Sequence, residues 1–500
     1  MRMPRFPCPA ICLLTFAFSA DATILYVDLN CTNSVPPYAG WDTAATNIQD
    51  AVDAALTGDQ VLVTNGIYQT GSRVSTDGSM NRVVVTNAIT LKSVNGPPAT
   101  DIDGSGTARC VYLADGAVVS GFTLLDGNAA AGGAVRCVSD NATVANCLVI
   151  SNSATAGGGG LYFGTASNCV IAWNNSQSSG GGADSCTLNN CVLSNNTSGL
   201  FGGGAAGGRS ALTNCVIWGN SSANNGGGVY GSTLNSCLII SNRAPTAFGG
   251  GAYECDLESC TVAGNSASSG GGIAASPSGF MHLAQNCIVY YNSGAGGGNF
   301  IPPVVIDNCC TSPLPSGSGN ITNPPLFLEL AAGDFHLQSN SPCINSGKNS
   351  YVSTTIDLDG NPRIVGGTVD IGAYEFQTPT SIISYAWLQQ YGLPTDGSAD
   401  FIDTDGDGMN NWKEWICGTD PTDPRSVLKM VSPSNSISGL KVPWQSVSNR
   451  TYYLQRATNL TALPAFLTVQ SNIAGKAGTT TYTDTNASAA GPFFYRVGVQ

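Results

Sequence analysis

Residues 168–182 read Asn-Cys-Val-Ile-Ala-Trp-Asn-Asn-Ser-Gln-Ser-Ser-Gly-Gly-Gly, and this pattern returns along the middle of the chain. Each unit begins with an Asn-Cys or Ser-Cys pair, continues with a short apolar run and reaches a glycine run. The cysteines of the pairs are Cys147, Cys169, Cys191, Cys215, Cys237, Cys260, Cys287 and Cys309, with steps of 22, 22, 24, 22, 23, 27 and 22 residues. A period of about 20–50 residues is the signature of a solenoid, a propeller or an array.

The period and composition of the repeat select among these architectures. No window of it places apolar residues at i, i+3, i+4 and i+7, so helical repeats are disfavoured. The leucine-rich pattern and the paired Gly-His and Trp-Asp signature of propellers are both missing. A unit of about 22 residues, with short β-rich runs between Gly and Asn, is typical of one coil of a parallel β-helix. We therefore predict an all-β fold whose coils stack at the inter-strand spacing of roughly 4.8 Å.

Stacked coils place equivalent residues in ladders. We expect the cysteines to form an inward ladder of small apolar groups, with the glycines allowing left-handed backbone at turns. Cysteines in register keep their Cβ atoms near 4.8 Å apart, whereas a disulfide needs about 3.8 Å, so free thiols are expected there. Pairing between different ladders stays open. An amide ladder at a corner is expected from the asparagines five residues after the cysteines, Asn152, Asn174, Asn196, Asn220, Asn242, Asn265 and Asn292.

The composition narrows the class of partner. Only 10% of the 500 residues are charged, 62 are glycine and the net charge is −13. Excess negative charge argues against nucleic acid or an anionic membrane as the partner. The acidity fits cation binding or simple solubility.

The first 22 residues read as a secretory signal. Arg2 and Arg5 form the charged start, residues 10–18 form the apolar run, and Ala20-Asp21-Ala22 offers a cleavage site. No other stretch reaches 18 apolar residues, so no further transmembrane helix is expected. We predict a secreted protein or one at the bacterial cell surface (outer membrane), acting as a monomer.

Residues 23–377 are predicted to be the β-helix with its cap and closing segment. Residues 47–55 form a short amphipathic helix, with Ile48, Val52 and Ala55 on one face. Terminal units of a solenoid must close its open ends, and this helix is placed to do so.

Several motifs in this region resemble known families. The order of Tyr26-Val27-Asp28, residues 47–52, residues 58–63 and residues 120–123 resembles exported bacterial right-handed parallel β-helix proteins of the pectin-lyase-like class. The Gly-rich coils resemble the repeats of polymorphic outer-membrane proteins. Residues 333–337, 341–347, 357–363 and 370–375 resemble the closing segment of the choice-of-anchor Q family. The resemblance implies a right-handed β-helix and export, and it implies little about function.

Residues 378–426 are predicted to be a helix followed by an EF-hand-like calcium loop. Residues 384–391 form the helix, and residues 403–414 fit the twelve-residue loop, with acids at positions 1, 3 and 5, glycine at 6 and glutamate at 12. Because residues 394–402 lack a regular entering helix, the segment resembles dockerin and thrombospondin type 3 repeats. We predict a structural Ca²⁺ ion, with Asp420 and Asp423 as further candidate ligands. The predicted loop ligands are Asp403, Asp405, Asp407, Met409, Asn411 and Glu414.

Residues 427–500 alternate as short strands separated by turn residues, which indicates a small β-sandwich similar to fibronectin type III.

A catalytic set is hard to assemble from the repeat. Glycoside hydrolysis needs paired carboxylates, and lyase chemistry needs a strong base beside a cation. Between residues 110 and 310 there is no lysine, and both histidines, His282 and His336, are expected to be structural. Glu254, Asp256 and Glu258 are expected to alternate on one strand and face one side. The weak catalytic candidates are Arg136, Arg209, Arg243, Glu254 and Asp256.

The sequence therefore predicts a non-catalytic β-helix with a structural, adhesive or polysaccharide-contacting role. The alternative is a carbohydrate-active enzyme of the pectate lyase-like type, since this fold class hosts such enzymes. A third hypothesis, a dockerin-like docking tag, needs a duplicated loop, and one full loop is present.

Overall fold

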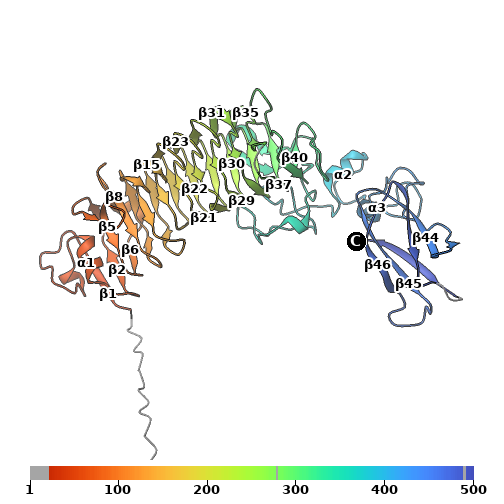
Figure 1. The fold of residues 1–500 in the computed structure, drawn as a ribbon, viewed down its shortest axis with the longest axis horizontal. Coiled ribbons are helices and arrows are strands. Elements are labelled where there is room, and N and C mark those ends of the chain that lie inside the picture. Colours follow the sequence, from red (N-terminus) through yellow and green to blue (C-terminus); the bar gives the residue numbers. More distant parts are fainter. Residues whose placement is uncertain (1–21, 278–279, 488–490) are drawn as a thin grey trace, which may run out of the picture.

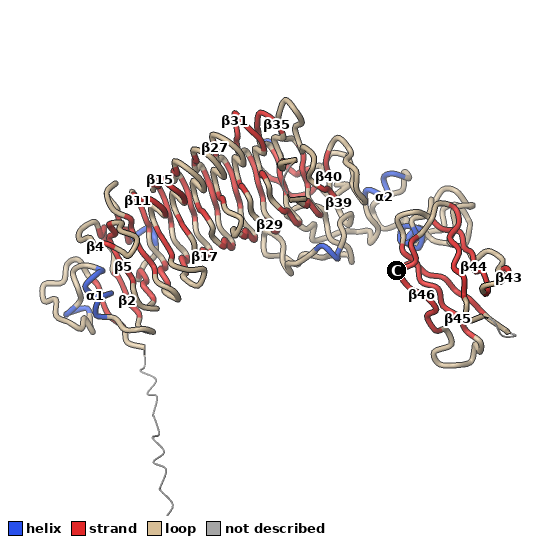
Figure 2. The backbone as a smooth tube through the Cα atoms, in the orientation of Figure 1, coloured by secondary structure: helices blue, strands red, loops and turns tan. Residues whose placement is uncertain are grey.

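The computed structural model describes residues 22–277, 280–487 and 491–500. The predicted secretory signal lies outside the described residues, apart from its last residue. A long coiled body is followed by a smaller C-terminal module (Figure 1). Figure 2 shows that strands make up the coiled body, with helix α1 at one end and helix α2 beyond the other.

The coiled body consists of four sheets that run along its length. Sheet A contains β1 (Ile24–Val27), β2 (Gln60–Val63), β6 (Thr90–Ser93), β9 (Val118–Ser120), β13 (Thr143–Ala145), β17 (Thr165–Ser167), β21 (Thr187–Asn189), β25 (Ala211–Thr213), β29 (Thr233–Asn235), β33 (Asp256–Glu258), β37 (Leu283–Gln285) and β39 (Val305–Asp307). Sheet B contains β3 (Gly66–Tyr68), β7 (Thr100–Asp103), β10 (Thr123–Leu125), β14 (Leu148–Ile150), β18 (Val170–Ala172), β22 (Val192–Ser194), β26 (Val216–Trp218), β30 (Leu238–Ile240), β34 (Thr261–Ala263), β38 (Ile288–Tyr290) and β40 (Cys310–Thr311).

The other two sheets complete each coil. Sheet C contains β4 (Arg73–Val74), β5 (Met80–Val85), β8 (Arg109–Leu113), β12 (Val135–Cys137), β16 (Leu161–Tyr162), β20 (Ala183–Asp184), β24 (Ala205–Ala206), β28 (Val229–Tyr230), β32 (Ala252–Tyr253) and β36 (Ile273–Ala274). Sheet D contains β11 (Asn128–Ala131), β15 (Ser153–Gly157), β19 (Asn175–Ser176), β23 (Thr197–Ser198), β27 (Ser221–Ser222), β31 (Arg243–Phe248) and β35 (Ser266–Ser269).

Each regular coil passes through sheets C, A, B and D in turn, and the same strand of the next coil pairs with it in parallel. In sheet B, for example, Ile171 pairs with Leu193 on the next coil, and Leu193 pairs with Ile217 on the coil after that. All three side chains are buried. Core residues alternate with outward-facing ones, as the pleat of a strand requires. The predicted fold, an all-β right-handed parallel β-helix followed by a β-sandwich, is confirmed.

The asparagine ladder is present in the predicted form. The Nδ2 of Asn174 donates to the Oδ1 of Asn196 at 3.0 Å, and the backbone N of Asn174 donates to the same oxygen at 3.0 Å. The same two bonds link Asn196 to Asn220. Each buried amide is therefore satisfied by the coil above or below it, as buried polar groups must be.

The cysteine ladder is buried and unpaired. All sixteen described cysteines are free thiols, and the eight ladder cysteines are buried in the core. The backbone N of Cys287 lies 3.2 Å from the sulfur of Cys309, so neighbouring rungs touch without a covalent bond. The prediction of free thiols in the ladder is confirmed for the described cysteines.

The residue before each ladder cysteine has a role that the sequence reading missed. Asn168 and Asn190 have φ of 53°, and Ser236 and Ser259 have φ of 50°. Asn tolerates this left-handed conformation better than most residues. The Asn-Cys pair is thus the corner where each coil turns from sheet A into sheet B.

Helix α1 (Ile48–Ala54) closes the N-terminal end of the coiled body, where Ile48 and Val52 join the core of the coils. Asn47 caps the helix, and its side chain accepts from the N–H of Asp50. The hairpin of β41 (Phe327–Glu329) and β42 (Asp334–Leu337) instead packs on the outer face of sheet B, against Leu238, Ile288 and Cys310. The 3₁₀ helices are η1 (Trp41–Thr43), η2 (Pro97–Ala99), η3 (Leu330–Ala332) and η4 (Asn349–Tyr351).

The closing segment contains a buried ionic cluster. Arg363 lies against the carbonyls of Asp370 and Gly372, and its Nη1 is 3.9 Å from Glu375. Burial is the main cause that raises the pKa of Asp370 to about 7 and that of Glu375 to about 8. One guanidinium thus faces two buried carboxyl groups, which ionise less readily than in water.

The C-terminal module follows the helices α2 (Tyr385–Gln390) and α3 (Asn411–Cys417). One sheet contains β43 (Ser434–Ser436), β44 (Gly439–Ser446) and β47 (Gly478–Asp484), and the other contains β45 (Thr451–Ala457), β46 (Leu467–Ala474) and β48 (Phe494–Val499). Val442, Trp444, Tyr452 and Leu454 form the core between them. Among the described residues, no helix has the length and apolar character needed to cross a bilayer.

Candidate functional sites

The loop 403–414 gathers its acids around one point. Carboxylate oxygens of Asp403, Asp405 and Asp407 lie within 4.8 Å of one another. The loop is shaped by its own backbone: the two oxygens of Asp403 accept from the N–H groups of Gly406 at 2.7 Å and Gly408 at 2.9 Å. Both glycines have positive φ, at 81° and 97°, which is the conformation that glycine adopts without strain. The spacing read from the sequence thus brings these three aspartates together.

Several carboxylate oxygens of this loop have no partner. The Oδ2 atoms of Asp405 and Asp407 and the Oε2 atom of Glu414 are buried and make no hydrogen bond within the described residues. Glu414 lies on α3 and is fully buried. Burial, and then the charges of Asp405 and Asp407, raise the pKa of Glu414 to about 7. A hard cation with oxygen ligands would relieve both the missing bonds and the repulsion.

Asn411 and Met409, the other predicted ligands, differ from these four acids. The Nδ2 of Asn411 donates to the carbonyl of Ala399 at 2.9 Å, and its Oδ1 accepts from Thr404 at 2.9 Å. Asn411 is thus already engaged in holding the loop to the preceding segment. The N–H of Met409 donates to Asp407 at 2.7 Å, which leaves its carbonyl as the atom that the calcium motif assigns to the ion. The set that fits a cation is four carboxylates and a backbone carbonyl.

Asp420 and Asp423 are engaged in turns of their own. Asp420 accepts from the N–H of Thr422 at 2.9 Å, and Asp423 forms an ion pair with Arg425 at 2.9 Å. Within the described part of the chain, neither joins the acidic cluster of the loop.

The three candidate arginines lie on different parts of the coiled body. Arg136 is on β12 of sheet C, Arg209 is exposed in the turn after β24, and Arg243 begins β31 of sheet D. Arg136 is 3.4 Å from Asp77 and lies over the ring of Tyr162 at 5.2 Å. No ion pair among the described residues joins any of the three to Glu254 or Asp256. The predicted catalytic candidates therefore do not form one site.

The placement of Glu254, Asp256 and Glu258 differs from the prediction that they share one strand. β33 contains only Asp256 and Glu258 of the three acids, because Glu254 has φ of 53° and lies at the corner between sheets C and A. The expectation that all three alternate on one strand is therefore wrong for Glu254. Asp256 lies 3.4 Å from His282, and Glu258 accepts from the backbone of Ser353 at 2.6 Å.

His336 contacts two aspartate side chains of the closing segment. His336 lies between Asp334 at 2.6 Å and Asp359 at 2.7 Å. Its hydrogen bonds to Asp359 and Asp334 raise its pKa against the opposing effect of burial.

A row of outward side chains on sheet C was not recognised in the sequence. We call it the sheet C row. Its neighbours on each strand, such as Val135, Leu161 and Val229, are core residues, so the row itself points out of the coil. The register places it on successive coils as Tyr112, Arg136, Tyr162, Asp184, Ala206, Tyr230 and Tyr253.

Aromatic rings stack at the C-terminal half of this row, where Phe201 and Phe248 lie beside its tyrosines. Phe201 and Tyr230 are 4.6 Å apart between ring centroids, and Tyr230 and Tyr253 are 5.9 Å apart with an interplanar angle of 14°. Phe248 adds a ring 6.3 Å from Tyr253 and is itself exposed. In this aromatic group Phe248 is exposed, Phe201 and Tyr230 are partly exposed, and Tyr253 is buried.

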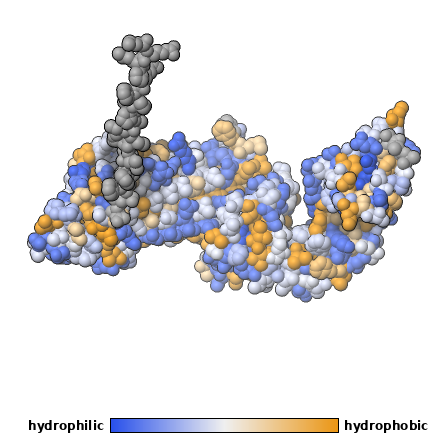
Figure 3. Space-filling view, turned by 90° about the horizontal axis from the view of Figure 1, so that it is seen from below, coloured by the Kyte–Doolittle hydropathy of each residue, from blue (hydrophilic) through white to orange (hydrophobic). Residues whose placement is uncertain are grey.

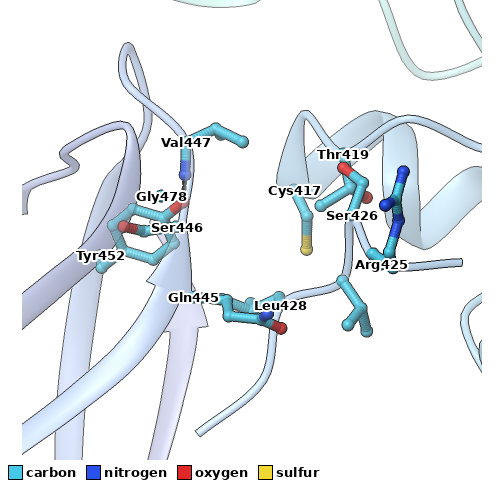
Figure 4. A pocket seen from close by; sticks show the side chains of 11 residues that line it. Cys417, Thr419, Arg425, Ser426, Leu428, Gln445, Ser446, Val447, Tyr452 and Gly478 are labelled. Carbon is cyan, nitrogen blue, oxygen red and sulfur yellow. Dashed lines mark hydrogen bonds between the residues drawn. The ribbon is translucent and has the colours of Figure 1, made fainter. Parts of the chain in front are cut away.

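A small hollow of about 270 Å³ lies between the C-terminal end of α3 and the β-sandwich. Figure 4 shows Cys417 and Thr419 on one side of it, with Ser446 and Tyr452 on the other. Burial raises the pKa of Cys417 to about 11, so its thiol is protonated at neutral pH and is a poor nucleophile. We assign this hollow to packing between the two modules.

The similarities of this chain to known proteins are to solved structures. No protein-family model matches the chain, and no curated protein sequence matches it. Pectate lyase Pel9A is similar in structure at a TM-score of 0.44 and 14% identity, over 72% of this chain and 97% of that one. A rhamnogalacturonan lyase is similar at a TM-score of 0.41 and 12% identity, over 75% of this chain and 100% of that one.

A third solved structure is more distant. Tailspike protein gp49 from Acinetobacter baumannii bacteriophage Fri1, a capsular polysaccharide depolymerase, is similar at a TM-score of 0.22 and 12% identity, over 89% of this chain and 76% of that one. Likenesses of this strength carry no conclusion about activity. The resemblances to choice-of-anchor Q and polymorphic outer-membrane proteins remain predictions.

Proposed function

We propose that this protein is an exported β-helix rod that binds polysaccharide along one lateral face without cleaving it. The observation that carries the proposal is the sheet C row, in which Arg136 lies over the ring of Tyr162, Asp184 follows on the next coil, and the rings of Tyr230 and Tyr253 stack further along. Sugar rings have apolar C–H faces that pack on flat aromatic surfaces, and their hydroxyls bond to polar groups at the ring edge.

The geometry of the row suits a polymer. Its side chains repeat once per coil, at roughly 4.8 Å, along a body that the stacked sheets keep rigid. A rigid, pre-formed surface orders fewer groups on binding, so less of the interaction energy is lost to entropy. Repeated weak contacts along one chain then add up to stable attachment.

The alternative hypothesis of a polysaccharide lyase finds less support. Lyase chemistry needs a base and a cation directed at one sugar. Arg136 is the one candidate arginine on the row, and its ion-pair partner in the described residues is Asp77. Product formation in the binding assay below would favour this alternative.

The test is a comparison of surface variants of residues 23–500 in affinity electrophoresis through polysaccharide gels. The double variant Tyr162→Ala/Tyr230→Ala removes two rings of the row, and we expect it to weaken binding by about tenfold or more. The matched control is Trp218→Ala, which removes an exposed ring from sheet B. A loss of binding in the control and not in the double variant would contradict the proposed face.

We also propose that the loop 403–414 binds one structural Ca²⁺ ion. Asp403, Asp405, Asp407, Glu414 and the carbonyl of Met409 would hold it. The ion would supply a positive charge that fixes α3 relative to the preceding segment. The unpartnered buried oxygens of Asp405, Asp407 and Glu414 support this proposal. Isothermal titration of the metal-free protein with Ca²⁺ tests it, with one site per chain expected.

A further inference from the structure

A second hollow lies where the coiled body meets the C-terminal module. Its volume is about 540 Å³, within the roughly 300–1,000 Å³ of small-molecule sites. Figure 3 shows the surface hollowed between the coiled body and the C-terminal module. Its lining comes from stretches that are far apart in the sequence, residues 308–323, 345–347 and 384–390 together with Trp415 and Arg450.

The walls of this hollow are held in place by hydrogen bonds. The backbone N–H of Tyr385 on α2 donates to the carbonyl of Ile344 at 3.1 Å. The Nε2 of Gln389 donates to the carbonyl of Asn340 at 2.8 Å, so α2 is fixed to the closing segment at two points. The hollow is therefore bounded on this side by a firmly attached helix.

Arg450 holds the opposite wall. Its Nε donates to the carbonyl of Ile416 at 3.0 Å, and its Nη2 donates to the carbonyl of Trp415 at 3.2 Å. These bonds fasten the C-terminal end of α3 to the β-sandwich. They also place the guanidinium among the groups that line the hollow, where its Nη1 donates to the carbonyl of Asn449 at 3.4 Å.

The hollow is lined by indole rings, side-chain amides and one guanidinium group. Trp387 and Trp415 supply two indole rings, and the Trp387 ring is held by Tyr391 at 5.0 Å. Asn323 and Gln390 supply amides that make no side-chain hydrogen bond to the rest of the described chain. Arg450 is the one charged residue among the described residues that line the hollow, in a chain whose net charge is −13.

We infer that this hollow binds a short oligosaccharide that carries a carboxylate group. Indole rings provide flat faces for sugar rings, and free amides provide the donors and acceptors that sugar hydroxyls need. A guanidinium pairs with a carboxylate through charge-assisted hydrogen bonds. A half-open hollow of this size fits a chain end or a short segment, whereas the sheet C row extends over successive coils.

This oligosaccharide site is additional to the proposed function. Its presence or absence can be tested independently of polysaccharide binding on the sheet C row. The two sites share no residue, so substitutions in one leave the other intact. The sheet C double variant Tyr162→Ala/Tyr230→Ala is therefore expected to bind short oligosaccharides normally.

The test uses residues 23–500 with Ca²⁺, a galacturonate tetrasaccharide, and the same tetrasaccharide with its carboxyl groups reduced to alcohols. Titration calorimetry and tryptophan fluorescence report binding. We expect the acidic form to bind at least about tenfold more tightly than the reduced form and to change the tryptophan emission. The variant Trp387→Phe is expected to remove much of that emission change.

The variant Asn323→Ala/Gln390→Ala removes two lining amides that hold nothing else together. It is expected to weaken binding by about tenfold while leaving the melting temperature unchanged. The matched control is Asn175→Ala, which removes an exposed amide from sheet D and is expected to have no effect. Absence of binding, equal binding of both tetrasaccharides, or normal binding by the double variant would overturn the inference.

Discussion

The coiled body and the loop 403–414 satisfy their polar groups in opposite ways. In the coils, each buried amide of the asparagine ladder bonds to the amide of the next coil, as Asn174 does to Asn196 at 3.0 Å. In the loop, carboxylate oxygens of Asp405, Asp407 and Glu414 are buried without a partner. Repetition lets a chain satisfy itself, whereas a cluster of like charges needs a partner from outside.

This difference separates the coils, whose amides bond to one another, from the parts of the molecule for which we propose a ligand. The coils bury few charged side chains, and their buried atoms without a partner are neutral, such as the hydroxyls of Ser198 and Ser259. In the loop the buried atoms without a partner belong to carboxylates, and in the hollow beside Arg450 the side-chain amides of Asn323 and Gln390 make no hydrogen bond within the described chain.

The largest effect is expected from breaking the ladder. Asn196→Ala leaves the Asn174 amide, the Ile171 carbonyl and the Asn220 oxygen short of partners in the core. We expect a loss of about 4 kcal/mol in the free energy of unfolding, measured by urea denaturation. Asn175→Ala, at an exposed neighbouring position, should change it by less than about 0.5 kcal/mol. Equal effects of the two would show that the ladder does not stabilise the stack.

The second effect concerns the ion. Saturating Ca²⁺ should raise the melting temperature of the C-terminal module, since a ligand at about 100 times its Kd adds about 2.7 kcal/mol. Glu414→Gln should abolish that shift. In chelator the same variant should melt above the wild type, because it removes a buried carboxylate whose pKa is raised to about 7. A Ca²⁺ shift that survives Glu414→Gln would contradict the assignment.

The third effect is a pH dependence of the closing segment. The folded pKa of Asp370 is about 7 and that of Glu375 about 8, above their ordinary values of 3.8 and 4.5. Raised pKa values mean that the folded state holds these protons more tightly, so stability is full below about pH 4 and falls as the pH rises to about 8. Thermal melts at pH 5.5 and 8.5 check this, with higher stability expected at pH 5.5. Glu375→Gln should flatten the slope, and an unchanged slope would rule out this cluster as its source.

The smallest effect concerns the thiols. Burial raises the pKa of Cys137 and Cys255 to about 12, so the native thiols should resist maleimide at neutral pH. In residues 23–500 we expect labelling of Cys31 alone before denaturation, since the other described cysteines are buried. Cys215→Ala should lower the free energy of unfolding by only about 1 kcal/mol. Rapid labelling of several native cysteines would show that the coils open.

The stack of coils could be predicted from the sequence because the same pattern of Cys, apolar residues, Asn and Gly recurs in each coil. The asparagine ladder follows from the spacing alone, and the convergence of Asp403, Asp405 and Asp407 follows from the loop motif. The engagement of Asn411 could not be foreseen, since it depends on the carbonyl of Ala399 lying beside the start of α3.

The sheet C row and the hollow near Arg450 could not be predicted from the sequence, for a different reason. Coil lengths vary between 22 and 27 residues, so the register that aligns Arg136 with Tyr162 and Asp184 appears only once the strands are paired. Glu254 was misplaced because a left-handed residue at a corner interrupts the alternation of a strand. The hollow near Arg450 forms from distant segments that only the packing of α2 and α3 brings together.

We propose that the protein binds polysaccharide without turnover. The most direct measurement incubates residues 23–500 with a panel of acidic and neutral polysaccharides, with Ca²⁺ and with chelator. Binding, product absorbance and reducing ends are recorded together. We predict binding to at least one polysaccharide with no new product on any of them. Turnover on any substrate, or the absence of binding to the whole panel, would contradict the account.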